Sequence, residues 1–181
     1  MRDSMQRLPL AAALALPVLL LVSCDGKRSE SPVSSLVGAE AAYQHTRSIV
    51  EFGPRPPGSA ALAKARSYVV TQLQASGWQV AKQTIPGDGP DGPVNFVNLL
   101  ARFGDEGGEH FWARPVEGLL AAHLDSKFYR TQEFVGADDA ASAVGVILEL
   151  ARELAATPDQ ARRMELVFFD GEEAFGTNIN L

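Results

Sequence analysis

Two short and mainly apolar segments, residues 118–122 and 164–169, flank a stretch whose apolar residues have helical spacing. The first segment shows no alternation of polar and apolar residues, which is typical of a central strand covered on both faces. The stretch between them carries one apolar stripe, made of Val144, Ile147, Leu148, Ala151 and Leu154. A strand, a helix and a strand in this order form a right-handed crossover with parallel strands. An α/β domain is therefore expected.

Further elements are predicted before this crossover. Ser59 occupies an N-cap position and Gly77 follows the helix that it would start. The predicted elements are helices over 39–52 and 60–76, strands over 78–85 and 94–103, and a Gly-, Pro- and Asp-rich turn over 86–93. Elements of both kinds in this order predict a three-layer α/β/α arrangement around a mixed, largely parallel central sheet.

The N-terminus has the features of an export signal. Arg2 and Arg7 precede an apolar run that is too short to span a bilayer comfortably. The run ends at Cys24 in a sequence that resembles a bacterial lipobox, so residues 1–24 are predicted to be a lipoprotein-type signal peptide. Residues 25–38 then form a tether, and 39–181 the domain. The protein is expected to be exported and lipid-anchored through Cys24 to a bacterial membrane, facing the periplasm or the exterior.

Composition and charge argue against an intrachain disulfide and against nucleic acid as a partner. Cys24 is the only cysteine of the chain, so an intrachain disulfide is excluded. The net charge is −6 and there is no basic stretch with interleaved aromatic residues. Nucleic acid is therefore not an expected partner.

Polar residues follow or precede the predicted crossover elements. His123 and Asp125 come after the first apolar segment, Asp139 precedes the helix, and Glu172 and Glu173 follow the second segment. The carboxyl ends of parallel strands meet at one crevice, where open α/β sheets bind their ligands. Zinc takes nitrogen and oxygen ligands from separate elements, and a further carboxylate can serve as a base. The pattern predicts a metal site.

Each of these residues also has a purely structural interpretation. Asp138 or Asp139 could cap the helix that follows, and His123 could be a hydrogen-bonded structural residue. The pair of glutamates could be a solvated surface. The coincidence of all three groups at the ends of predicted elements favours the metal site over these alternatives.

Several motifs resemble those of glutaminyl-peptide cyclotransferases, which share their α/β fold with zinc aminopeptidases. The motifs are GPRPPGS at 53–59, HLDSK at 123–127, FVGADD at 134–139, LELAR at 148–152 and FFDGEEAF at 168–175. The resemblance extends over residues 39–175 and implies a zinc-exopeptidase-like fold.

The resemblance also implies roles. Asp139 and Glu173 match zinc ligands, and Glu172 matches the general acid and base. His123 matches a ligand of a second metal in the two-zinc aminopeptidases, and Asp125 matches the residue that orients it. Because the cyclases use a single zinc ion, one Zn²⁺ is expected for a cyclase and two for an aminopeptidase.

The family takes a further His ligand and a further Asp from positions beyond the glutamate pair, and this chain has neither. The chain is therefore expected to be the N-terminal part of such a domain, incomplete at its C-terminus and inactive alone. Residues 176–181 also no longer resemble the family.

The segment after the glutamate pair and the residues after Asp139 resemble cyclases more than aminopeptidases. A cyclase would act on peptide or protein N-termini. The α-amine of an N-terminal Gln would attack its own zinc-polarised γ-amide, and Glu172 would move a proton from the amine to the departing ammonia. The alternatives are an aminopeptidase, in which Glu172 activates water, and an anchored binding protein without catalysis.

Overall fold

The computed structural model describes residues 38–173. Its elements are α1 (Ala39–Val50), α2 (Ala60–Ala75), β1 (Trp78–Gly89), β2 (Gly92–Phe103), α3 (Glu109–Ala113), β3 (Gly118–His123), a π-type turn η2 (Ala137–Ser142), α4 (Ala143–Leu154), α5 (Pro158–Ala161) and β4 (Met164–Phe169). The predicted signal peptide and Cys24 lie outside the described residues. No helix within 38–173 is both long enough and apolar enough to cross a membrane.

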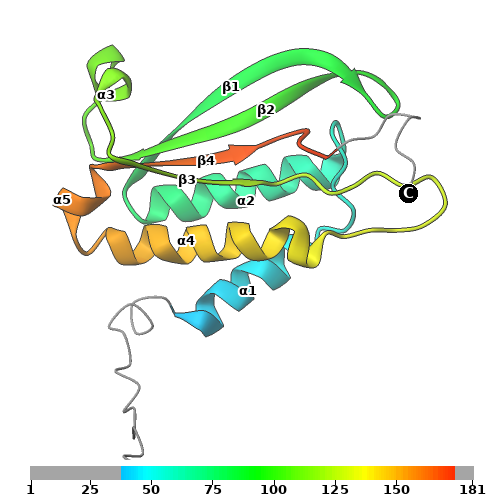
Figure 1. The fold of residues 1–181 in the computed structure, drawn as a ribbon, viewed down its shortest axis with the longest axis horizontal. Helices are drawn as coiled ribbons and strands as arrows, with labels where there is room; N and C mark the ends of the chain where they lie inside the picture. The colour runs from blue at the N-terminus through cyan, green and yellow to red at the C-terminus, as the bar shows by residue number, and fades with distance from the viewer. Residues whose placement is uncertain (1–37, 174–181) are drawn as a thin grey trace, which may run out of the picture. The chain divides into compact units, whose positions relative to one another are not determined.

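The strands form one mixed sheet in the order β1-β2-β4-β3 (Figure 1). The predicted crossover is confirmed, because β3 and β4 are parallel and are joined through α4. The other two pairings, β1 with β2 and β2 with β4, are antiparallel. The mixed α/β fold class is thus confirmed, with one parallel pairing among the described strands.

Both apolar segments are predicted to be inner strands, and in the described sheet β4 takes an inner position whereas β3 does not. Residues 165–168 of β4 are all buried, whereas β3 forms an edge of this sheet and Leu119 is 56% exposed. The lack of alternation in β3 therefore does not reflect burial on both faces within residues 38–173.

The β1–β2 hairpin is longer than predicted. Pro86 pairs with Asn95 and Gly89 with Gly92, so only two residues remain for the turn that was expected over 86–93. Proline lacks the N–H that an inner strand would need, but an edge strand tolerates it. β1 lies at an edge of the described sheet, which explains why the strand continues through Pro86.

Helices α2 and α4 lie along one face of the sheet, and α1 packs against α4 (Figure 1). The Ser59 cap is confirmed, since its Oγ accepts a hydrogen bond from the Leu62 N–H at 3.1 Å. Gly77 has a φ of +81°, a left-handed conformation that glycine adopts at little cost after a helix. The core joins these helices to the sheet through Leu62, Val69, Leu73, Leu99, Val144, Ile147, Leu148, Leu166 and Phe168.

Candidate metal centre

The carboxyl ends of β3 and β4 lie side by side and carry the polar residues that the sequence singled out. His123, the last residue of β3, is paired with Phe169, the last residue of β4. The ladder continues one step further, because the Leu124 N–H donates to the Phe169 carbonyl at 2.9 Å. The loop after His123 and the loop that carries Glu172 and Glu173 therefore leave the sheet together.

Three of the predicted residues come together at this edge. Side-chain donor atoms of His123, Asp139 and Glu173 all lie within 4.8 Å of one another. Tetrahedral zinc with bonds of about 2.1 Å would place its ligand atoms about 3.4 Å apart. One imidazole nitrogen and two carboxylate oxygens are also donors that zinc accepts. The residues present therefore fit a zinc ion.

Asp139 reaches this group because the chain before α4 is not helical. Asp139 and Ala140 depart from helical φ and ψ, and α4 begins only at Ala143. Gly136 has a φ of +52°, and a Cβ at this position would clash with the carbonyl oxygen of Asp139. Position 136 of the GADD motif therefore requires glycine, because the carbonyl oxygen of Asp139 leaves no room for a Cβ.

The structure contradicts the capping interpretation of the two aspartates. No side chain caps the N-terminus of α4, and the Nε2 of His123 lies 2.8 Å from Asp139 Oδ1. Asp138 instead offers its backbone carbonyl to the Ser142 hydroxyl at 2.7 Å. The Asp139 side chain is 70% exposed and directs its carboxylate to His123.

Asp125 lies behind the group and is fully buried. Its two carboxylate oxygens accept the backbone N–H groups of Glu172 at 3.3 Å and Glu173 at 3.1 Å. One of the same oxygens lies 3.5 Å from Nδ1 of His123. Asp125 therefore ties the loop with the glutamate pair to the end of β3.

Known proteins resemble this chain over most of the described part. The peptidase family M28 model matches residues 105–177, which contain His123, Asp139 and the glutamate pair. This match covers less than half of the chain and includes the segments that carry the candidate site. The glutaminyl-peptide cyclotransferase of Gloydius blomhoffii is 33% identical over 141 residues, and the cyclotransferase-like protein of Mus musculus is 33% identical over 130. These alignments cover 70% and 66% of this chain, and 36% and 32% of the relatives.

Solved structures of glutaminyl cyclases and of a zinc exopeptidase share the fold of this chain. The glutaminyl cyclase of Porphyromonas gingivalis superposes with a TM-score of 0.67 at 33% identity, over 79% of this chain and 49% of that one. A Zn-dependent exopeptidase from Parabacteroides distasonis gives a TM-score of 0.68 at 28% identity, over 80% and 50%. The resemblance to glutaminyl cyclases and zinc exopeptidases is confirmed. The chain spans about a third of the curated relatives' length.

The carboxylates of Asp125, Asp139 and Glu172 lie around His123. Its pKa is raised to about 9, chiefly by the Asp125 carboxylate, then by Asp139, with burial acting in the opposite direction. Burial raises the pKa of Glu173, which the Lys127 ammonium at 3.6 Å counteracts. The imidazole is thus protonated at neutral pH in the ion-free protein, and a metal ion bound through it would displace that proton.

Glu172 differs from Glu173 in its surroundings. Its side chain is 60% exposed, and its Oε2 lies 3.9 Å from Nε2 of His123, whereas only 13% of the Glu173 side chain is exposed. Of the two glutamates, one therefore directs its carboxylate to the donor group and the other is exposed to solvent. This division is compatible with one metal ligand and one base.

Sequence reasoning missed the residues that hold the start of the glutamate loop. The buried Asp170 carboxylate accepts the Val97 N–H and a guanidinium N–H of Arg66, both at 2.8 Å, and its own N–H donates to Asn98 Oδ1. Burial raises the pKa of Asp170. Asp170 lies in the FFDGEEAF motif, but nothing in the sequence identified Arg66 or Asn98 as its partners.

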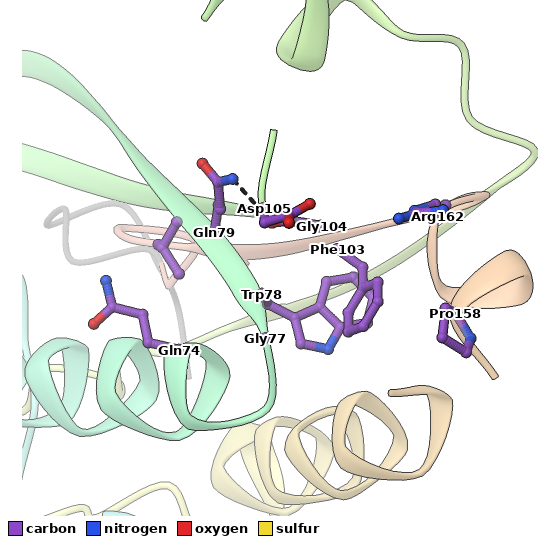
Figure 2. A pocket seen from close by; sticks show the side chains of 10 residues that line it. Gln74, Gly77, Trp78, Gln79, Phe103, Gly104, Asp105, Pro158 and Arg162 are labelled. Atoms are coloured by element: carbon purple, nitrogen blue, oxygen red, sulfur yellow. Dashed lines mark hydrogen bonds between the residues drawn. The ribbon is translucent and has the colours of Figure 1, made fainter. Parts of the chain in front are cut away.

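A cavity of about 610 Å³ lies at the opposite end of the sheet (Figure 2). It is lined by the start of β1, the end of β2 and the chain around α5, including Trp78, Phe103, Asp105 and Arg162. This is the end at which β4 begins, far along the strand from the metal donors. The donor group and the family motifs therefore make the carboxyl ends of β3 and β4 the candidate site, and not this cavity.

Proposed function

We propose that the chain is part of a zinc-dependent glutaminyl-peptide cyclotransferase, which converts an N-terminal Gln of a peptide or protein into pyroglutamate and releases ammonia. The observation that carries the proposal is the group of donors formed by His123, Asp139 and Glu173, with the exposed Glu172 beside it. The curated relatives that are named glutaminyl-peptide cyclotransferases support the choice of reaction.

Asp139 and Glu173 would hold the ion, with His123 as a third donor. The family resemblance assigned His123 to a second metal, but its Nε2 lies in the same group as the two carboxylates. A single ion is therefore the number that we propose. When bound, zinc would polarise the γ-amide carbonyl of the substrate and favour attack on its carbon.

Residues of this chain would transfer a proton from the substrate amine to the leaving group. The α-amine of the substrate attacks its own γ-carbon, a C–N bond closes the five-membered ring, and the bond to the amide nitrogen breaks. Glu172 accepts the proton that the amine loses and delivers it to the departing nitrogen, which leaves as ammonia. Asp125 holds the backbone N–H of Glu172 and so fixes the base relative to the donor group.

An aminopeptidase is the second candidate, favoured by the M28 match and by the likeness to a Zn-dependent exopeptidase. The same residues would serve it, with Glu172 taking a proton from water instead of from the substrate amine. Hydrolysis would then release the first residue of the peptide without forming a ring.

The two reactions are separated by incubating the full-length protein with Gln-initiated and with Leu- or Ala-initiated peptides, followed by mass spectrometry. Loss of ammonia from the Gln peptides, with the others intact, is the expected result. Free Leu or Ala as the main product would establish the aminopeptidase instead.

The roles within the site are tested by two nearly isosteric variants of adjacent residues. Glu172→Gln is expected to abolish turnover with zinc still bound, and Glu173→Gln to lower the zinc content itself. Zinc analysis of both purified variants decides the assignment, and an equal loss of zinc in the two would show it to be wrong.

A further inference from the structure

The GPRPPGS segment belongs to none of the roles described so far, yet its Arg55 is fully buried. Within the described residues, every hydrogen bond of its guanidinium goes to a backbone carbonyl. Nη1 donates to Val135 at 2.8 Å and to Ile49 and Gly53 at 3.3 Å each, Nε donates to Leu124 at 3.0 Å, and Nη2 donates to Gly136 at 3.3 Å.

Three of these carbonyls belong to the two segments that carry the metal donors. Leu124 directly follows His123, and Val135 and Gly136 open the turn that leads to Asp139. One planar guanidinium therefore contacts the backbone on both sides of the donor group at once. An arginine can do this because its five N–H donors have a fixed geometry.

The backbone of Arg55 makes a second link between the same segments. Its N–H donates to the Ser126 hydroxyl at 2.8 Å, and that hydroxyl donates to the Phe134 carbonyl at 3.1 Å. The Ser126 N–H returns a hydrogen bond to the Arg55 carbonyl at 3.1 Å. Arg55 and Ser126 together hold the chain after His123 to the chain before Asp139.

Arg55 keeps its charge in this position. Burial lowers the pKa of its guanidinium to about 10, and the nearby Asp125 carboxylate counteracts that shift. The side chain is therefore still protonated at neutral pH, and five carbonyl dipoles take the place of its hydration. Its position is fixed by these partners, since a buried charge without them would be very unfavourable.

We propose that Arg55 is a positioning residue, which sets the spacing between His123 and Asp139 by holding the backbones of both loops. The inference rests on the proposed metal site, since its consequence is a preorganised group of zinc ligands. Outer partners that orient ligands typically contribute about 10- to 100-fold to metal affinity.

The experiment compares Arg55→Met and Arg55→Lys with a matched control, Arg102→Met, in the full-length protein. Arg102 is also buried and donates to two backbone carbonyls, those of Phe111 and Arg114, and to Glu165, but it lies at the other end of the sheet. Zinc affinity is measured by competition with a chelator, at a temperature where all variants are folded.

Arg55→Met is expected to weaken zinc binding by at least about tenfold, the lower end of the effect of such partners. Arg55→Lys should weaken it less, because an ammonium can still reach some of the carbonyls. Arg102→Met should leave zinc affinity unchanged although it destabilises the fold. Wild-type affinity in Arg55→Met, or an equal loss in Arg102→Met, would overturn the proposal.

Hydrogen exchange provides a readout that does not depend on zinc. The N–H groups of Leu124, Ser126 and Ala141 lie in the two loops and donate to the carbonyls of Phe169, Arg55 and Gly136, respectively. They should exchange faster in Arg55→Met but not in Arg102→Met. If the wild-type protein takes up no zinc, the proposed function fails and this exchange pattern alone decides the role of Arg55.

If Arg55→Met does not fold, Ser126→Ala tests the same link, because it removes the hydroxyl between Arg55 and Phe134. Weaker zinc binding in that variant supports the proposal, and wild-type affinity overturns it.

Discussion

Replacing Asp125 with asparagine changes one atom of a buried side chain and tests how the site is held. The asparagine keeps one carbonyl oxygen but presents an NH₂ group in place of the second oxygen. In the native protein both oxygens accept backbone N–H groups, from Glu172 and from Glu173. One of these two N–H groups would therefore face another donor and lose its acceptor.

The magnitude follows from that single contact. A hydrogen bond to a charged group contributes about 1.5–3 kcal/mol, and a buried N–H left without an acceptor costs about 1–3 kcal/mol. Both figures describe the same contact, so they are not added. Because Asp125 is fully buried, little of the loss is recovered by water. The expected decrease in the free energy of unfolding is about 2–3 kcal/mol.

A second consequence concerns His123. The Asp125 carboxylate is the largest cause of the raised pKa of this imidazole, so the pKa should fall in Asp125→Asn. Urea unfolding measures the change in stability, and NMR titration of the ion-free protein measures the change in pKa.

Asp138→Asn provides the control, since Asp138 is exposed and the one hydrogen bond of its side chain within residues 38–173 is accepted from the Ser142 hydroxyl. Its stability should stay within about 0.5 kcal/mol of the wild type, as for most surface substitutions. If Asp125→Asn were as stable as this control and the pKa of His123 did not move, Asp125 would not be the support described above.

Three further predictions concern other parts of the chain. The pKa of Glu149 lies below its ordinary value of 4.5, mainly because Arg152 donates hydrogen bonds to the carboxylate. The ionised Glu149 side chain therefore stabilises the fold above about pH 4.5, and this stabilisation is lost as the pH falls through the lowered pKa. Thermal unfolding should therefore depend more steeply on pH below about 4.5 in the wild type than in Glu149→Gln. Gly136→Ala should cost at least about 1–2 kcal/mol in the free energy of unfolding, the ordinary cost of a left-handed residue, and lower zinc affinity through the clash with Asp139. Cys24→Ser should release the protein from membranes and block processing of the precursor, and unchanged fractionation and processing would exclude lipidation at Cys24.

The crossover was predictable because its signals are local. The apolar runs of β3 and β4 and the apolar stripe of α4 are visible in consecutive residues, and the order of the three elements imposes parallel pairing. The place of β3 in the sheet was not predictable in this way. Whether an apolar strand is inner or at an edge depends on which strands pair with it, and its own sequence does not contain that information.

The proximity of His123, Asp139 and Glu173 was predictable for a related reason. His123 ends a parallel strand and Glu173 closely follows its neighbour, and parallel topology brings such ends together whatever the details of packing. Asp139 was predicted at a helix N-terminus, but it reaches the group from a non-helical turn. Its motif identified the residue, and only the structure gives the conformation that aims it.

The hydrogen-bond partners of Arg55 could not be predicted from the sequence. When a buried arginine forms an ion pair, candidates for its partner can be found in the sequence, because the partner must be an aspartate or a glutamate. Arg55 is instead held by carbonyls of the backbone, which every residue carries, so nothing at Leu124 or Val135 identifies either as its partner. The contact depends on where the two loops run and not on which side chains they bear. For the same reason, substitutions at Leu124 or Val135 would leave these hydrogen bonds in place, whereas no substitution at Arg55 can reproduce all of them.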